Sequence, residues 1–255
     1  MSFPAFKLPD PKTPLEHAAA AIGWHPSTLR DLLQCARWTN ERQTAEFAQT
    51  DWLKRLAADV VEAQVAKFIK PIGPVGAREL SSKELAAKIS VGSLREAVAD
   101  YAGGAALLLG KTGVGKTLAA LLMARREAAG IERERLQRRR PEDLCEEIQL
   151  RQHAAYVAWV SCAELPRIAA SEPFGREHSS VTAAKRAPLA VLDDLTWGAT
   201  DKTLLEILAS RYDHGLPTIS TAGATRKELV SRFGDAVVRR LLECRGQKGL
   251  VVEAF

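Results

Sequence analysis

The chain has 255 residues, 46% of them hydrophobic and 26% charged, which is the balance of a globular protein with a buried core. The formal net charge of +5 permits contact with nucleic acid but does not by itself define a binding site. The four cysteines have no C-x-x-C spacing, which argues against a zinc site or a disulfide framework. The sequence shows no signal-peptide core and no apolar stretch of membrane-helix length, so we expect a cytoplasmic protein with no membrane partner.

The N-terminal part is predicted to form a small helical domain. Four prolines within residues 1–14 predict an extended, disordered arm. Over residues 15–68, apolar residues recur at three- and four-residue steps, which is typical of helices. Two prolines and two glycines within residues 70–77 break this pattern and mark a domain boundary. We therefore predict a helical, partner-binding region over residues 1–75 and a second domain over residues 76–255.

The second domain alternates short apolar runs with helical patterns. Strands are expected at residues 105–110, within 154–165, at 188–195 and at 216–223, and helices over 80–101 in two pieces, 116–130 and 202–215. This alternation is typical of an α/β fold with a mostly parallel sheet. The highly charged segment 131–152 is predicted to be an insertion, either a solvated helical hairpin or a surface that contacts DNA or a partner. Residues 81–98 also resemble the first two helices of a helix-turn-helix, although the second would lead straight into a strand.

A phosphate-binding loop lies between the first predicted strand and the following helix. Its sequence, GKTGVGKT, matches the G-x-x-x-x-G-K-[ST] pattern, in which glycines let backbone N–H groups point at phosphate oxygens. Lys116 would reach the β- and γ-phosphates, and the Thr117 hydroxyl would bind Mg²⁺. The predicted nucleotide-binding residues are Gly110, Lys111, Thr112, Gly113, Val114, Gly115, Lys116, Thr117 and Leu118.

Two carboxylates end the third predicted strand, in the run LAVLDD. A P-loop enzyme needs an acidic residue near this place to hold the metal, and we assign this role to Asp193, acting through water. Asp194 stands where a carboxylate would orient or deprotonate the attacking water. The N-K-x-D element that is typical of GTPases does not occur, so the expected cofactors are ATP and Mg²⁺.

Five stretches in order resemble the AAA+ ATPases of the DnaC/IstB type, which are bacterial and phage helicase loaders and the ATPase subunits of certain transposons. The stretches are LLLGKTGVGKTLAA, YVAWVSCAEL, LAVLDDL, LLEILASRYDHGLPTISTAG and TRKELVSRFGDAVVRRLLE, within residues 93–250. The resemblance implies a P-loop NTPase (AAA+) core of three layers with a mostly parallel sheet, preceded by the small helical domain.

The resemblance also assigns two further site positions. The asparagine that helps to position the attacking water in this family corresponds to Gly223, and Thr221 could replace it only if the strand were shifted. The commoner glutamate of the acidic pair corresponds to Asp194. Both departures imply slow hydrolysis. Arg240, in VVRRLLE, aligns with the arginine finger, which acts on the γ-phosphate of an adjacent subunit. Arg239 is its neighbour.

The resemblance implies a slow ATPase that DNA or a protein partner stimulates. On ATP binding it would form a homo-oligomer and load a replicative helicase onto single-stranded DNA. One alternative is the ATPase subunit of a transposition system, which binds DNA and activates a transposase. A second alternative is a regulatory module that binds ATP with little turnover.

Overall fold

The computed structural model describes residues 62, 65, 66, 69–138, 156–170, 178–195, 202–244 and 246–255. The chain divides into two compact units, residues 1–69 with 129–154 and residues 70–128 with 155–255. The predicted arm (1–14), nearly all of the predicted helical segment (15–68) and the end of the charged segment (139–152) lie outside the described residues. The partner-binding region over residues 1–75 therefore stays a prediction.

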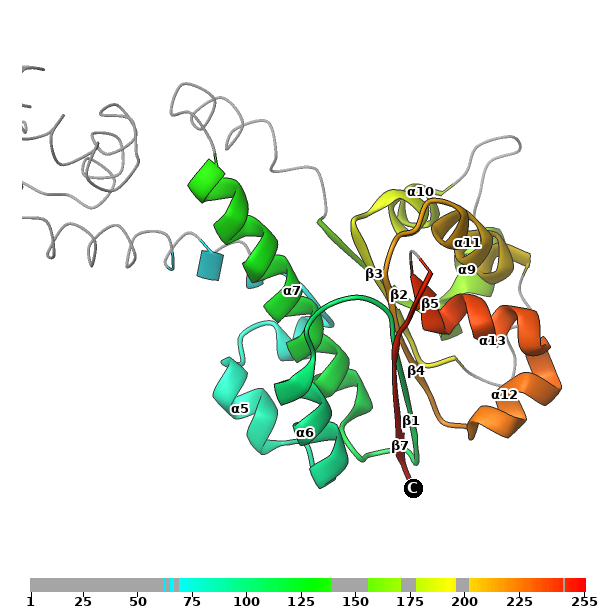
Figure 1. Cartoon of the computed structure of the whole chain (residues 1–255), viewed down its shortest axis with the longest axis horizontal. Helices are drawn as coiled ribbons and strands as arrows, with labels where there is room; N and C mark the ends of the chain where they lie inside the picture. The colour runs from blue at the N-terminus through cyan, green and yellow to red at the C-terminus, as the bar shows by residue number, and fades with distance from the viewer. Residues whose placement is uncertain are drawn as a thin grey trace, which may run out of the picture. The chain divides into compact units, whose positions relative to one another are not determined.

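Short helices and strands alternate along most of the described chain (Figure 1). In chain order the elements are η1 (Val75–Ala77), α5 (Ser82–Ala87), α6 (Gly92–Asp100), β1 (Ala106–Gly110), α7 (Lys116–Arg138), β2 (Val157–Ser161), η3 (Cys162–Glu164), α9 (Leu165–Ala170), α10 (Ser179–Arg186), β3 (Leu189–Asp193), α11 (Lys202–Asp213), β4 (Thr218–Ala222), α12 (Arg226–Phe233), α13 (Asp235–Leu242), β5 (Glu243–Cys244), β6 (Gln247–Lys248) and β7 (Leu250–Ala254).

The second unit is built on a five-stranded sheet in the order β2-β3-β4-β1-β7, and every neighbouring pair is parallel. The predicted α/β fold with a mostly parallel sheet is thereby confirmed. Strand β7 was not predicted, because its apolar run, Leu250–Val252, is only three residues long. Because β4 lies between β1 and β3, the loops that follow β1 and β3 meet around the carboxyl end of β4.

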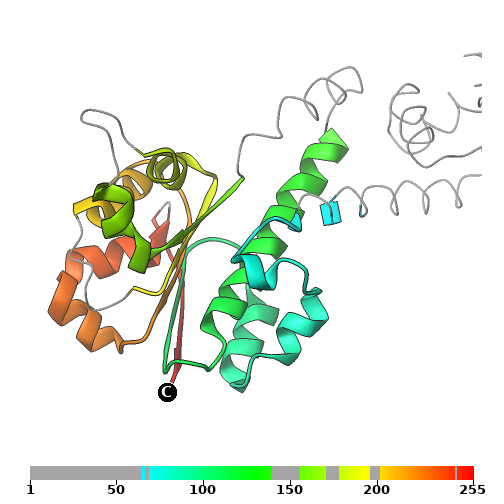
Figure 2. The same cartoon turned by 180° about the vertical axis from the view of Figure 1, so that it is seen from behind.

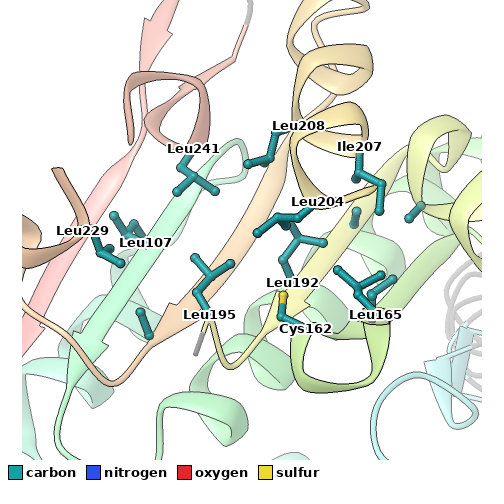
Figure 3. Close-up of a cluster of buried hydrophobic side chains, with 14 of the residues drawn as sticks. Leu107, Cys162, Leu165, Leu192, Leu195, Leu204, Ile207, Leu208, Leu229 and Leu241 are labelled. Atoms are coloured by element: carbon teal, nitrogen blue, oxygen red, sulfur yellow. The ribbon is translucent and has the colours of Figure 1, made fainter. Parts of the chain in front are cut away.

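Helices cover both faces of this sheet, as the two opposite views show (Figures 1 and 2). Helices α5, α6 and the first turns of α7 lie on one face, and α9 to α13 lie on the other. The core on the second face joins strand residues such as Leu107 and Leu192 to helix residues such as Leu204 and Leu241 (Figure 3). A leucine that is fully buried in this way contributes roughly 1.5–3 kcal/mol, so the strand ends are held firmly in place.

Helix α7 is longer than expected, because it continues past Gly130 to Arg138. The residues that follow Gly130 are mostly Glu, Arg, Leu and Gln, which favour helix, and a single interior glycine costs only about 1 kcal/mol. The first part of the charged segment 131–152 is therefore a continuation of α7. Across the described ranges, none of the helices combines the length and the apolar composition that crossing a membrane requires.

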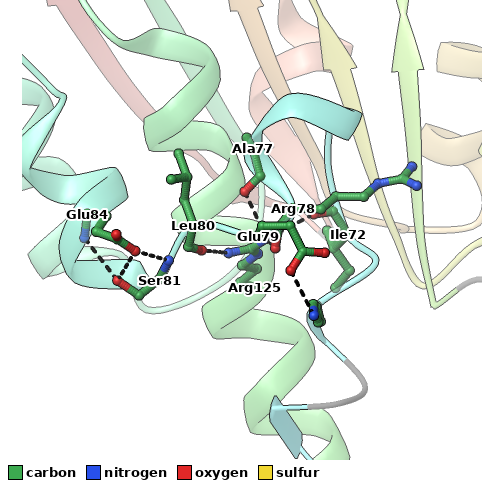
Figure 4. Close-up of polar contacts among 9 residues, drawn as sticks. Ile72, Ala77, Arg78, Glu79, Leu80, Ser81, Glu84 and Arg125 are labelled. Carbon is green, nitrogen blue, oxygen red and sulfur yellow. Dashed lines mark hydrogen bonds and ion pairs between the residues drawn. The ribbon is translucent and has the colours of Figure 1, made fainter.

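A buried arginine ties α7 to the segment that precedes α5 (Figure 4). Arg125 is only 5% exposed, and its guanidinium donates hydrogen bonds to the backbone carbonyl oxygens of Ile72, Ala77, Arg78 and Leu80, at 2.8 to 3.5 Å. Burial lowers the pKa of Arg125 from its usual value. These four bonds hold the chain against α7, one residue before Ser81 caps the start of α5.

A second buried arginine holds the amino edge of the sheet together. Arg211 of α11 donates to the Thr218 hydroxyl at 2.9 Å and to the carbonyl oxygens of Ala184, Ala187 and Pro217. Its burial lowers the pKa of the guanidinium to about 10, where it still carries its charge at neutral pH. Helices α10 and α11 and the start of β4 are thus fixed to one another at the end of the sheet where β4 begins.

Candidate nucleotide-binding site

The phosphate loop runs from the end of β1 to the start of α7, and two of its glycines have no room for a side chain. At Gly110, with φ of 155°, an added Cβ would lie 2.3 Å from the carbonyl oxygen of Ala254 in β7. At Gly115, with φ of 100°, it would lie 3.0 Å from the Cα of Ile89. The loop is therefore packed between β7 and the segment that joins α5 to α6, and this packing requires glycine at both positions.

Lys116 places its ammonium group on the loop itself. Its Nζ donates to the carbonyl oxygens of Gly110, at 2.7 Å, and Lys111, at 2.8 Å. Burial lowers the pKa of Lys116, while the nearby carboxylates of Asp194 and Asp193 act in the opposite direction. The lysine thus brings a positive charge to the loop that the sequence motif assigns to phosphates.

The Thr117 hydroxyl and the Asp193 carboxylate meet at the carboxyl edge of the sheet. The Thr117 hydroxyl donates to Oδ1 of Asp193 at 2.9 Å, and the Thr221 hydroxyl of β4 donates to the same oxygen at 2.8 Å. Burial raises the pKa of Asp193, and the hydrogen bonds from Thr221 and Thr117 oppose this rise by stabilising the charged form. A partly buried carboxylate is therefore held between two hydroxyl groups.

Asp194 has an unusual backbone conformation. Its φ is 60°, and it is the only non-glycine residue with positive φ among the described residues. Its amide donates to the Thr221 hydroxyl at 2.8 Å, and the next amide, that of Leu195, donates to the Thr221 carbonyl oxygen at 2.8 Å. Such a conformation costs roughly 1–3 kcal/mol and is common at functional sites, where surrounding contacts maintain it. The Asp194 side chain is exposed.

These residues fit a nucleotide phosphate with Mg²⁺. Hydroxyl and carboxylate oxygens are the hard ligands that Mg²⁺ prefers, and Mg²⁺ is commonly held by one or two protein groups together with substrate phosphates. No group of three or more His, Cys, Asp or Glu side chains among the described residues would hold a metal on its own. Thr117 and Asp193 therefore suit a cation that arrives with phosphate oxygens.

Sequence reasoning missed one segment at the loop. Ser90, between α5 and α6, donates from its hydroxyl to the carbonyl oxygen of Val114 at 3.2 Å, and Ile89 packs against Gly115. A serine and an isoleucine before a helix have no recognisable motif, so only the folded chain brings them to the loop. The segment 89–90 fixes the outer side of the loop.

Gly223 follows directly after β4, at the same edge as the acidic pair. It is exposed, and no heavy atom lies within 4 Å of the position that a Cβ would take. The place that the resemblance assigns to an asparagine is therefore open, and this chain supplies no side chain there.

Arg240 is not brought to the loop of its own chain. It lies near the end of α13, and its guanidinium carbon is 5.9 Å from the ring centre of Tyr212 on α11. The last residue of α13, Leu242, accepts a bond from the amide of Gly249, which precedes β7 at the amino edge of the sheet. The phosphate loop starts at the opposite end of β1, and that strand is roughly 16 Å long.

The predicted site residues thus fall into two groups. The loop residues 110–118 meet Asp193 and Asp194 at the carboxyl edge, whereas Arg240 lies toward the other edge. Arg239, its neighbour, makes an exposed ion pair with Glu243 at 3.9 Å.

No protein-family model matches the sequence, and no curated protein matches it. Several solved structures resemble the chain at low identity, among them those of the DnaC helicase loader and of DnaI. The structure of the DnaC helicase loader has 20% identity and a TM-score of 0.42, and the match covers 63% of this chain and 86% of that one. The structure of DnaI has 18% identity and a TM-score of 0.42, and the match covers 74% of this chain and 89% of that one.

Proposed function

We propose that this chain is a Mg²⁺-dependent ATPase of the AAA+ type. The observation that carries this proposal is the hydrogen bond from the Thr117 hydroxyl to Asp193, which joins the loop helix to the acidic strand. The Thr117 proton is directed at Asp193, so the lone pairs of the hydroxyl are available to a cation. Mg²⁺ held there would offset the negative charge of the phosphates.

The other loop groups have complementary tasks. The backbone N–H groups of residues 110–117 and the start of α7 bind phosphate oxygens, because these donors and the helix N-terminus favour negative charge. Lys116 adds a cation at the β- and γ-phosphates. The exposed carboxylate of Asp194 orients a water for attack and accepts its proton. Since Gly223 offers no donor to that water, we expect turnover to be slow.

The active assembly is a homo-oligomer in which each subunit completes the site of its neighbour. The position of Arg240 supports this part of the proposal, because its guanidinium lies toward the amino edge of the sheet and the loop of the same chain lies at the other edge. In the assembly, Arg240 approaches the γ-phosphate held by the adjacent subunit and stabilises the charge that develops during transfer.

The cellular role that we propose is the loading of a replicative helicase onto single-stranded DNA. Its support is the motif order described above, from GKTGVGKT to VVRRLLE. The helicase would be held by residues 1–75, and basic residues of the assembled ATPase would contact the DNA backbone. A helicase-loading assay, described below, tests this role separately from ATP binding.

Calorimetry of ATP binding tests the first part. Lys116→Ala should abolish Mg-ATP binding while leaving the fold intact. Lys227→Ala is the matched control, because it removes an exposed lysine from α12, the helix that follows the carboxyl end of β4. Unchanged ATP affinity in Lys116→Ala would overturn the assignment of the loop.

A helicase-loading assay tests the second part. The full chain is mixed with the replicative helicase of its own host and with circular single-stranded DNA coated by single-strand-binding protein. Loading is measured as unwinding of an annealed oligonucleotide. We expect unwinding to require both the chain and ATP, and to fail with Lys116→Ala. No effect on the helicase, together with stimulated strand transfer by a transposase, would assign the chain to transposition. ATP binding with neither effect and no phosphate release would identify a regulatory module.

A further inference from the structure

Thr221 connects the two acidic residues to the strand beside them. It lies in β4 and is 1% exposed. Its hydroxyl donates to Oδ1 of Asp193 and accepts from the amide of Asp194, and both distances are 2.8 Å. Its carbonyl oxygen accepts from the amide of Leu195, also at 2.8 Å. One buried residue therefore makes three hydrogen bonds to three consecutive residues at the end of β3.

The direction of one hydrogen bond of the Thr221 hydroxyl determines the direction of the other. A hydroxyl has one proton, and here that proton is given to Asp193, so the amide of Asp194 can only meet a lone pair. The β-branched side chain of threonine has few allowed rotamers, which limits the hydroxyl to this geometry. Thr221 thus fixes the side chain of Asp193 and the backbone of Asp194 with a single group.

The effect on Asp194 follows from its backbone. A residue with φ of 60° points its side chain in a direction that the preceding extended strand would not give. Three contacts hold that turn in place: the bond from the Asp194 amide to the Thr221 hydroxyl, the bond from the Leu195 amide to the Thr221 carbonyl oxygen, and the burial of Leu195, which is 3% exposed in the core (Figure 3). The direction of the Asp194 carboxylate therefore depends on Thr221.

We propose that Thr221 is the positioning residue of the acidic pair: from within β4 it orients Asp193 and Asp194, whereas the water-positioning donor that the family resemblance places at position 223 stays missing. The inference rests on the proposed ATPase function. Thr221 acts through Asp193 and Asp194, while Gly223 after the strand contributes no side chain. Removing the Thr221 hydroxyl should loosen the orientation of both carboxylates without disturbing the phosphate loop, although Asp193 keeps its bond from Thr117.

The test compares Thr221→Val, which keeps the shape of the side chain and removes its hydroxyl, with Thr221→Ser, which keeps the hydroxyl. Thr218→Val is the matched control, because Thr218 is a buried threonine of the same strand whose hydroxyl accepts from Arg211 at the other edge. The affinity for ATP is measured by calorimetry with Mg²⁺ and with EDTA. Hydrogen exchange at the Asp194 amide and steady-state phosphate release are measured on the same proteins.

In Thr221→Val, we expect the Mg²⁺-dependent gain in ATP affinity and the kcat each to fall by roughly 10- to 100-fold, the usual effect of removing a group that orients a metal ligand. ATP affinity in EDTA should stay unchanged, and the Asp194 amide should exchange faster. Thr221→Ser should restore most of the loss. Thr218→Val should lower the stability but change neither the Mg²⁺ dependence nor the exchange at Asp194.

The outcomes separate this inference from the proposed function. If the wild-type protein binds no Mg-ATP, the ATPase proposal fails. If the wild type binds Mg-ATP and Lys116→Ala does not, but Thr221→Val matches the wild type in Mg²⁺ dependence and in exchange, the positioning role is wrong. If Thr221→Val does not fold, Thr221→Ala replaces it, since the difference between the alanine and serine variants isolates the hydroxyl. Equal Mg²⁺ dependence in those two variants would overturn the inference.

Discussion

The Thr117 hydroxyl and the Asp193 carboxylate form a 2.9 Å hydrogen bond although 76 residues separate them in sequence. Thr117 is the second residue of α7 and Asp193 is the last residue of β3. They meet because β1, β4 and β3 are neighbouring parallel strands, so their carboxyl ends lie at the same edge of the sheet. The site therefore depends on strand order as much as on the two motifs.

Stability should respond in opposite directions to alanine at two glycines. Gly110→Ala would bring a Cβ to 2.3 Å from the Ala254 carbonyl oxygen, and we expect it to lower the free energy of unfolding by roughly 2–4 kcal/mol through strain and overpacking. Gly130 lies inside α7, and no neighbouring heavy atom lies within 4 Å of the position that a Cβ would take. Gly130→Ala should therefore raise the free energy of unfolding by about 0.5–1 kcal/mol. Urea denaturation measures both. A stable Gly110→Ala protein would show that β7 does not press on the loop.

Turnover should be slow and should rise when Gly223 is replaced by asparagine. We expect a kcat below the range of about 1–100 s⁻¹ that kinases show. The site at Gly223 is open, so Gly223→Asn should change the stability by no more than about 0.5 kcal/mol. The new amide should raise the kcat about 10-fold or more by orienting the attacking water. Gly223→Ala, which adds no donor, is the control, and an equal effect of both variants would exclude an orienting role.

Mixing two inactive variants should restore ATPase activity if Arg240 acts across a subunit boundary. Arg240→Ala should bind ATP but hydrolyse it poorly, and Lys116→Ala should do neither. Mixed assemblies contain boundaries where an intact loop meets an intact arginine, so phosphate release with single-stranded DNA should partly recover as one variant is titrated into the other.

The control for this experiment is Arg239→Ala. If ATPase activity recovers in mixtures with Arg239→Ala and not in mixtures with Arg240→Ala, the arginine finger is Arg239 and not Arg240. If native mass spectrometry shows mixed assemblies and no ratio of the two proteins restores activity, Arg240 has only its local contact with Tyr212.

The stability of the protein should depend on pH through Glu127. The Tyr101 hydroxyl donates to the Gly104 carbonyl oxygen at 2.8 Å and also contacts the Glu127 carboxyl group. The Tyr101 hydroxyl donates to the Glu127 carboxyl group, which favours the ionised form, whereas burial of that carboxyl group favours the protonated form. Burial raises the pKa of Glu127, and its hydrogen bonds with Tyr101 and the Gly104 backbone only partly oppose this.

The sign follows from the raised folded-state pKa. The contribution of Glu127 to stability is fully present below its unfolded pKa, near 4.3, and is lost as pH rises through the folded value. Glu127→Gln should therefore remove this loss and be more stable than the wild type at neutral pH. Urea denaturation at a series of pH values between 4 and 8 measures the free energy of unfolding of both proteins. The advantage of the variant should grow as the pH rises, and a difference that does not change with pH would contradict the prediction.

Much of the candidate site could be predicted from local sequence motifs. The loop from Gly110 to Thr117 and the acidic pair could be found in the sequence because each is a continuous run with a recognisable pattern. From the sequence, Thr221 could replace the missing asparagine only if the strand were shifted. Its contacts with Asp193 and Asp194 could not be predicted, because they depend on which strand lies between β1 and β3, and strand order leaves no mark in a single sequence. The left-handed backbone conformation of Asp194 could not be predicted either, because the hydrogen bond that stabilises it joins its amide to Thr221 in another strand.

The two buried arginines show a further limit of prediction from sequence. Arg125 and Arg211 bind mainly backbone carbonyl oxygens, which every residue carries, so neither partner segment has a distinctive composition.

This way of holding the chain has an evolutionary consequence. A segment that is held through its carbonyl oxygens can exchange its exposed side chains without weakening these hydrogen bonds, provided that its backbone keeps its path. The exposed positions of these segments, such as Val75, Glu79 and Arg186, can therefore change without loss of these hydrogen bonds, whereas Ala77, Ala184 and other core positions are also constrained by their burial.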